Sequence, residues 1–300
     1  MSNSNLPKSI AVIGAGTMGN GIAQTFASCG VPTYMIDVQQ EFVDRGVAAV
    51  HKSLGRFVEK GTLTAEVAER TKKLLVGTTD KKHLQEVDLC IEAVTENVEV
   101  KTAVFREADA AMKPGAILAS NTSSISITVL GAKTKRADRV IGMHFMNPVP
   151  LMKLVEVIRG NDTSDATTES VLAWSRSLGK VPVPATDYPG FVANRILMPM
   201  INEAIYTLYE GVSGVEGIDT VMKLGMAHPM GPLQLADFIG LDVCLAILRV
   251  LHEGFGNPKY APCPLLVNMV TAGKLGVKSG EGFYAYTPGS KDLVVAERFR

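Results

Sequence analysis

Residues 10–21 of the chain read IAVIGAGTMGNG, and this stretch decides the fold. Gly14, Gly16 and Gly19 form a G-x-G-x-x-G motif that directly follows a short apolar strand and opens a helix. In such a turn the first glycine allows the tight bend, the second lets the backbone approach a pyrophosphate, and the third lets helix and strand pack closely. The N–H groups and the dipole of the helix N-terminus then meet the phosphate charge. We therefore expect a dinucleotide cofactor to bind at Gly14, Gly16, Thr17, Met18 and Gly19.

A second predicted strand, residues 33–36, ends at Asp37, 18 residues after Gly19. An acidic side chain at this place accepts hydrogen bonds from the adenosine ribose hydroxyls and repels a 2′-phosphate. The next three residues, Val38, Gln39 and Gln40, supply no arginine that would bind such a phosphate. The pattern predicts NAD rather than NADP as the cofactor. The alternative is a tight turn followed by a surface aspartate.

Short β-branched runs alternate with longer amphipathic stretches from residue 9 to about residue 185. The predicted strands cover residues 9–13, 33–36, 74–77, 88–93, 116–119, 140–144, 153–157 and 181–185, and the predicted helices cover residues 18–28, 40–60, 65–73, 98–111 and 167–178. This succession is typical of a mostly parallel sheet with helices on both faces. We therefore predict a Rossmann-type, doubly wound α/β domain over residues 1–187.

After Pro189 the strand-like runs stop, and the remaining chain predicts helices separated by glycine and proline. These helices cover residues 191–210, 217–223, 232–239, 242–253 and 264–271. The segment T-D-Y-P-G at residues 186–190 indicates a turn or a linker. The predicted fold class is therefore α/β, with an all-α domain over residues 188–300 following the Rossmann-type domain.

The composition excludes several classes of protein. Of the 300 residues, 46% are hydrophobic, which is enough to bury a core, and 30 basic residues balance 30 acidic ones. A chain without net charge has no overall field to attract nucleic acid or an anionic membrane. Four cysteines without a C-x-x-C pair do not suggest a disulfide framework, and the histidine spacings give no metal site. Since no apolar run approaches 18 residues and residues 1–9 lack a signal region, we expect a cytoplasmic protein.

A run of hydroxyl and amide side chains, S-N-T-S-S at residues 120–124, directly follows the predicted strand 116–119. Ligands bind beyond the carboxyl ends of strands in open α/β sheets, so these side chains are placed to hydrogen-bond a ligand. The alternative is a turn and a helix cap before Ile125, since serine and asparagine favour both.

His144 lies near the end of the next predicted strand, on the same edge of the sheet. Histidine titrates near neutral pH and can act there as a general base. Glu156 lies twelve residues later inside an apolar run, where an unpaired carboxylate would be costly. We interpret the two as a pair in which Glu156 fixes the imidazole tautomer and stabilises the imidazolium. The alternative is that His144 is a core residue and Glu156 lies on an edge strand, without contact between the two.

Together these motifs resemble those of the short-chain L-3-hydroxyacyl-CoA dehydrogenases, a family that includes bacterial 3-hydroxybutyryl-CoA dehydrogenases. The similarity extends along nearly the whole chain, through GAGTMGNGIA, EAVTEN, ASNTSS, HFMNPVPLMKLVEV, PGFVANR, HPMGPLQLADFIGLD and GFYAY. It implies reversible, NAD-dependent oxidation of the 3-hydroxyl of an (S)-3-hydroxyacyl-CoA to a 3-ketoacyl-CoA. It also implies a homodimer and a second domain that serves dimerisation.

The resemblance assigns catalytic roles to four residues. His144 matches the catalytic base of the family, and Glu156 matches its partner. Ser123 and Asn194 match residues that contact the reacting oxygen and the neighbouring thioester of the substrate.

Five further residues match positions that touch the cofactor or the substrate. Asn147 matches a residue that lines the catalytic site, and Glu96 and Lys101 match positions near the nicotinamide end of the cofactor. Ser53 and Lys60, seven residues apart in a predicted helix, match positions that touch coenzyme A.

Two other functions stay open at this point. One is an NAD-dependent dehydrogenase of a free hydroxy acid or sugar acid, related to the lambda-type lens crystallins. The other is a non-catalytic NAD-binding or structural protein. The chain also departs from the family pattern twice: Glu281 stands where a basic residue is common, and 14 residues follow Tyr286.

Overall fold

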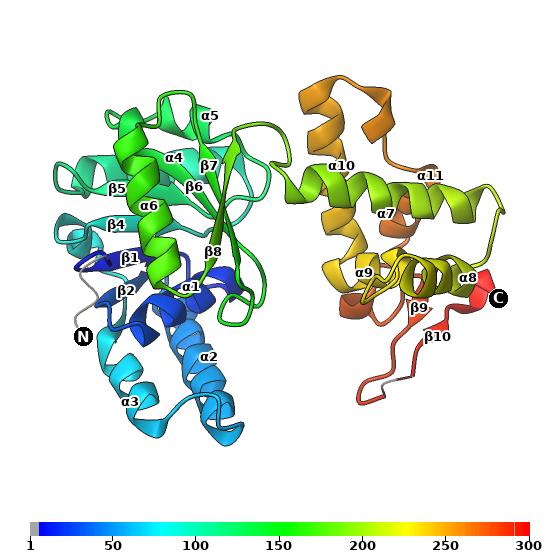
Figure 1. The fold of residues 1–300 in the computed structure, drawn as a ribbon, viewed down its shortest axis with the longest axis horizontal. Helices are drawn as coiled ribbons and strands as arrows, with labels where there is room; N and C mark the ends of the chain where they lie inside the picture. The colour runs from blue at the N-terminus through cyan, green and yellow to red at the C-terminus, as the bar shows by residue number, and fades with distance from the viewer. Residues whose placement is uncertain (1–5, 291) are drawn as a thin grey trace. The chain divides into compact units, whose positions relative to one another are not determined.

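The computed structural model describes residues 6–290 and 292–300. The chain forms two compact units, of which the first ends at Phe191 and the second begins at Val192. The division thus falls four residues after the boundary expected from the sequence, 187/188. Figure 1 shows a sheet covered by helices in the first unit and a group of helices in the second.

Eight strands of the first unit form one sheet in the order β3-β2-β1-β4-β5-β6-β7-β8. They are β1 (Ile10–Ile13), β2 (Thr33–Ile36), β3 (Leu75–Thr78), β4 (Leu89–Glu92), β5 (Ile117–Ser120), β6 (Val140–Phe145), β7 (Leu154–Arg159) and β8 (Val181–Thr186). Strands β1 to β6 are parallel, whereas β7 is antiparallel to β6 and parallel to β8. The order 3-2-1-4-5-6 is that of a Rossmann sheet, so the predicted doubly wound fold is confirmed.

Helices cover both faces of this sheet because successive strand side chains point to opposite faces. Ile10 and Val12 of β1 belong to a core shared with α1 (Thr17–Ser28), α2 (Gln40–Glu59), α3 (Ala65–Leu74) and α6 (Asp165–Ser177). Ala11 and Ile13 belong to a second core, shared with α4 (Val98–Ala111), α5 (Ile127–Gly131) and the 3₁₀ helix η1 (Lys81–Gln85). The carboxyl ends of the parallel strands therefore meet at one edge, between the two helical layers.

The second unit is built around helices that share one apolar core. Its elements are α7 (Ala193–Tyr209), α8 (Val215–Thr220), the π-helical η3 (Val221–Gly225), α9 (Pro232–Ile239), α10 (Leu241–Phe255), η4 (Pro258–Tyr260), α11 (Pro264–Thr271), η5 (Val277–Ser279) and η6 (Glu297–Phe299). The helix predicted over residues 217–223 is thus divided between α8 and η3. None of the described helices in either unit is both long and apolar enough to cross a membrane.

The expectation that strands stop after Pro189 is wrong in one detail. Residues Tyr284–Ala285 (β9) and Val294–Val295 (β10) form a small antiparallel hairpin. Strands of two residues are too short for an alternating pattern to reveal them. The start of the hairpin is held instead by Asp237, whose carboxylate accepts hydrogen bonds from the N–H groups of Phe283 (3.0 Å) and Tyr284 (2.9 Å).

Candidate active site

The glycine turn joins β1 to α1 at the carboxyl edge of the sheet. Gly14 has a φ of +107°, and a Cβ there would lie 2.5 Å from the Ala93 carbonyl oxygen, so only glycine fits. A Cβ on Gly19 would collide with the Gly14 carbonyl group. A Cβ on Gly16 would meet no described protein atom within 4 Å and would occupy open space beside a cavity that Gly16 lines. The turn thus leaves the backbone open to close approach by a ligand.

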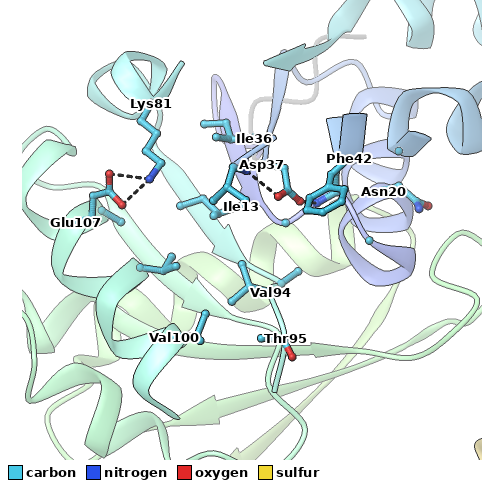
Figure 2. A pocket seen from close by; sticks show the side chains of 18 of the residues that line it. Ile13, Asn20, Ile36, Asp37, Phe42, Lys81, Val94, Thr95, Val100 and Glu107 are labelled. Carbon is cyan, nitrogen blue, oxygen red and sulfur yellow. Dashed lines mark hydrogen bonds and ion pairs between the residues drawn. The ribbon is translucent and has the colours of Figure 1, made fainter. Parts of the chain in front are cut away.

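The cavity beside this turn has a volume of about 550 Å³ and lies within the first unit. Asp37 forms part of its wall, with Oδ2 accepting the N–H of Ala15 and Oδ1 accepting the N–H of Val38, both at 2.7 Å (Figure 2). These bonds fix the carboxylate, and its remaining lone pairs are available to ribose hydroxyls. Of the other residues predicted at the turn, Thr17 lines the cavity, whereas the Met18 side chain packs against the hydrophobic core.

The residues around the cavity fit a dinucleotide. Within residues 6–290, no side chain caps the N-terminus of α1, so the N–H groups of its first turn can receive a pyrophosphate. Most of the lining is apolar, as the adenine of such a cofactor requires. Sequence reasoning found Asp37 but missed Arg45, which also lines the cavity and lies with its guanidinium carbon 4.9 Å from the ring centre of Phe42.

A buried ion pair lies at the ends of β4 and β5. Lys101, which is 1% exposed, donates to Glu92 Oε1 at 2.7 Å and lies 3.2 Å from Glu96 Oε2. Glu92 also accepts the N–H of Val94 at 2.6 Å and the hydroxyl of Ser120 at 2.6 Å, so this fully buried carboxylate is well satisfied. Glu92 was not among the residues predicted from the sequence. An acidic residue at the end of the apolar run Leu89–Glu92 does indicate a buried carboxylate that needs a partner.

The serine-rich loop folds around Glu96. Oε1 of this carboxylate accepts hydrogen bonds from the Thr122 hydroxyl (2.5 Å), from the Ser123 N–H (3.0 Å) and from the Ser124 hydroxyl (3.0 Å). The Ser123 hydroxyl is 3.4 Å from the same oxygen. Partial burial opposes ionisation of Glu96, but the Lys101 charge and these hydrogen bonds outweigh it and lower the pKa of the carboxyl. The structure therefore brings together Glu96, Lys101 and Ser123, three of the predicted site residues.

His144 and Glu156 face each other across the antiparallel strands β6 and β7. The strand register pairs the two residues directly, and His144 Nδ1 lies 2.8 Å from Glu156 Oε2. Because a carboxylate only accepts hydrogen bonds, this contact favours the neutral tautomer of His144 that has its proton on Nδ1 and a lone pair on Nε2. The two side chains are largely buried, at 10% and 2% exposure. The ring of Phe191 lies 6.1 Å from the imidazole, centre to centre.

The side chain of Asn121 ties the serine-rich loop to the strand of His144. Its Oδ1 accepts the N–H of Phe145, the residue after His144, at 2.9 Å. Asn147, a predicted site residue, lies exposed in the loop that follows β6. The predicted helix cap also exists, but it is Ser126, which accepts the N–H of Val129 at the start of α5.

The remaining predicted site residues lie elsewhere. Ser53 lies on α2, and Lys60, the residue after its end, lines a separate hollow of about 370 Å³ together with Lys180. Asn194 lies in the first turn of α7 in the second unit and is 8% exposed. Among the described residues, no group of three or more His, Cys, Asp or Glu side chains is placed to hold a metal ion.

Comparison with known proteins covers almost the whole chain. Residues 9–188 match the family model of the NAD-binding domain of 3-hydroxyacyl-CoA dehydrogenase, and residues 190–286 match that of its C-terminal domain.

Similar proteins are known at high identity. A probable 3-hydroxybutyryl-CoA dehydrogenase from Deinococcus radiodurans is 56% identical over 92% of this chain and 99% of its own length. One from Bacillus subtilis is 55% identical over 93% of this chain and 97% of its own length. The crystal structure of an (S)-3-hydroxybutyryl-CoA dehydrogenase from Ralstonia eutropha superimposes with a TM-score of 0.92 at 50% identity, over 94% of this chain and 99% of that one.

Proposed function

The chain belongs to the 3-hydroxyacyl-CoA dehydrogenase family, and on that premise we propose that it oxidises the 3-hydroxyl of an (S)-3-hydroxyacyl-CoA reversibly, with His144 as the general base. The observation that carries the proposed chemistry is the 2.8 Å bond between His144 Nδ1 and Glu156 Oε2. It leaves the other imidazole nitrogen as a proton acceptor at the carboxyl edge of the sheet.

Oxidation of the alcohol removes a hydride from C3 and a proton from the hydroxyl. Bound NAD supplies the hydride acceptor. Nε2 of His144 takes the hydroxyl proton, and the carboxylate of Glu156 stabilises the imidazolium that results. In the reverse direction the imidazolium returns this proton to the oxygen of the 3-keto group. Because Glu156 is only 2% exposed, little solvent screens its charge from the imidazole.

Ser123 and Asn194 serve in this proposal as hydrogen-bond donors to substrate oxygens. Oε1 of Glu96 accepts a hydrogen bond from the N–H of Ser123 at 3.0 Å and thereby orients the serine-rich loop. Lys101 in turn lies 3.2 Å from Glu96 Oε2, and we propose that this ion pair supports the nicotinamide end of the cofactor. Asn147 is proposed to line the same site from the loop after β6.

For coenzyme A we propose contacts with Ser53 and Lys60. The support is local: Lys60 lines the hollow of about 370 Å³, where its ammonium group can meet a phosphate. In this proposal local contacts hold both phosphorylated ligands, so binding does not need a net positive charge of the chain.

The test of this function is NADH-dependent reduction of acetoacetyl-CoA by the purified protein, followed by the loss of absorbance at 340 nm. We expect turnover with acetoacetyl-CoA and little with free 3-hydroxy acids or sugar acids offered with NAD. Oxidation of a free acid without activity on the CoA ester would favour the hydroxy-acid function. Binding of NADH without any turnover would favour a non-catalytic protein.

We propose further that the protein is a cytoplasmic homodimer. Its helical unit exposes large apolar side chains, among them Ile196 at 68%, Val212 at 72% and Leu224 at 82%, and their burial against a second copy of the chain would favour association. All four cysteines are free thiols, as in proteins of a reducing compartment. Sedimentation equilibrium is expected to give twice the chain mass of 32.0 kDa, and cell fractionation tests the location.

A further inference from the structure

An ion pair from two different elements stands in the wall of the dinucleotide cavity. Lys81, at the start of η1, donates to both carboxylate oxygens of Glu107 on α4, at 2.8 Å and 2.7 Å. Figure 2 shows this pair on one side of the cavity and Asp37 on the other, with Ile13 and Ile36 between them. At 37% and 51% exposure of the two side chains, the pair contributes little to the stability of the fold.

The part of the cavity between Asp37 and this ion pair is suited to a flat heteroaromatic ring. The aliphatic side chains that line the cavity as a whole are Ile13, Ile36, Leu84, Val94, Val100 and Val104, and Ile13 and Ile36 lie between Asp37 and the ion pair (Figure 2). With the ribose hydroxyls at Asp37, the attached base extends away from the pyrophosphate into this apolar region. The polar edge of a base placed in this way would face Lys81 and Glu107. Among the described residues, this is the one ion pair of which both partners line the cavity.

We propose that Lys81 and Glu107 read the adenine of the cofactor. In this arrangement Glu107 accepts a hydrogen bond from the 6-amino group, and Lys81 donates one to the neighbouring ring nitrogen. The acceptor Glu107 thus faces the hydrogen-bond donor of adenine, and the donor Lys81 faces its acceptor. The inference rests on the proposed function, in which NAD is the cofactor.

Hypoxanthine reverses this order, because it carries a 6-oxo acceptor and an N1–H donor. Its oxygen would face the carboxylate of Glu107, and its N–H would face the ammonium group of Lys81. The two side chains come from opposite elements, η1 and α4, and therefore do not exchange places without movement of the helices. We expect the site to bind NADH about tenfold more tightly than deamino-NADH, the hypoxanthine analogue. The expected difference in affinity is moderate because the mismatched polar groups are partly exposed to solvent.

The experiment is a fluorescence titration of the purified protein with NADH and with deamino-NADH, which reports binding independently of turnover. Glu107→Gln keeps the side-chain size but offers both an acceptor and a donor, so the two dinucleotides are expected to bind within about twofold of each other. Lys81→Met removes the hydrogen-bond donor and is expected to weaken the binding of NADH more than the binding of deamino-NADH. Glu69→Gln is the matched control, since it disrupts an exposed ion pair with Lys72 (2.6 Å) outside the cavity. The control is expected to keep the tenfold preference.

Equal affinities of the unsubstituted protein for the two dinucleotides would overturn the proposal. So would a preference that survives in Glu107→Gln. If the unsubstituted protein bound neither dinucleotide, the proposed function itself would fail, and this inference would fail with it.

Discussion

Replacement of Glu156 by glutamine tests the part that this residue plays in catalysis. The substitution keeps the shape of the side chain and removes its charge from the partner of His144. Glutamine can also donate its amide N–H to Nδ1, which would move the imidazole proton to Nε2 and block the base. Both effects act on the chemical step and leave the cavity of the cofactor untouched.

The expected magnitude follows from the geometry of the pair. With Nδ1 and Oε2 2.8 Å apart, the centres of the two charges in the imidazolium–carboxylate state are about 4 Å apart. At an effective dielectric constant of about 20 this attraction is worth about 4 kcal/mol. Since about 1.36 kcal/mol changes a rate tenfold, the loss of the charge is expected to lower kcat about 10³-fold.

The assay is the steady-state rate of acetoacetyl-CoA reduction at saturating substrate, with NADH affinity and thermal unfolding measured on the same sample. A merely structural role would change unfolding or binding, whereas the account expects kcat alone to fall. Glu169→Gln, an exposed acid on α6, is the matched control and is expected to behave like the parent. A Glu156→Gln enzyme within about fivefold of the parent kcat would refute the reasoning.

Three further outcomes are expected. His144→Ala lowers kcat by about 10²–10⁴ with unchanged NADH affinity, and activity within a few-fold of the parent would remove His144 from the mechanism. Asp37→Ala narrows the preference for NADH over NADPH in binding titrations, because the carboxylate no longer repels the 2′-phosphate while Arg45 still lines the cavity. An unchanged ratio of the two affinities would mean that Asp37 does not face the ribose. Burial raises the pKa of Asp237 to about 6, so the folded protein holds this proton more tightly than the unfolded chain does. The free energy of unfolding, measured in urea, is therefore expected to fall by about 2 kcal/mol between pH 4 and pH 6 relative to Asp237→Asn. Parallel profiles of the two proteins would contradict this.

The fold of the first unit could be predicted because local signals and tertiary packing agree there. Each strand buried on both faces is a short apolar run, and the helices between them are long enough for their periodicity to show. The helix α5 and the hairpin β9–β10 gave no such signal, because elements of five and two residues carry too little periodicity. Contacts between residues distant in the sequence stabilise these short elements. One example is the hydrogen bond from the N–H of Tyr284 in β9 to the carboxylate of Asp237.

The site could be predicted in part for a similar reason. The twelve-residue separation of His144 and Glu156 suits two antiparallel strands joined by a loop, and the register makes them direct neighbours. The ion pair of Lys101 and Glu92 joins a helix to a strand end, so no spacing rule reveals it. Whether Glu107 meets Lys81, 26 residues away, depends likewise on how η1 packs beside α4.

The most direct test of the account is oxidation of the two enantiomers of 3-hydroxybutyryl-CoA with NAD, measured as the appearance of NADH at 340 nm. We predict that the purified protein oxidises the (S) enantiomer and leaves the (R) enantiomer unchanged. Absence of oxidation with either enantiomer, or equal rates with both, would contradict it.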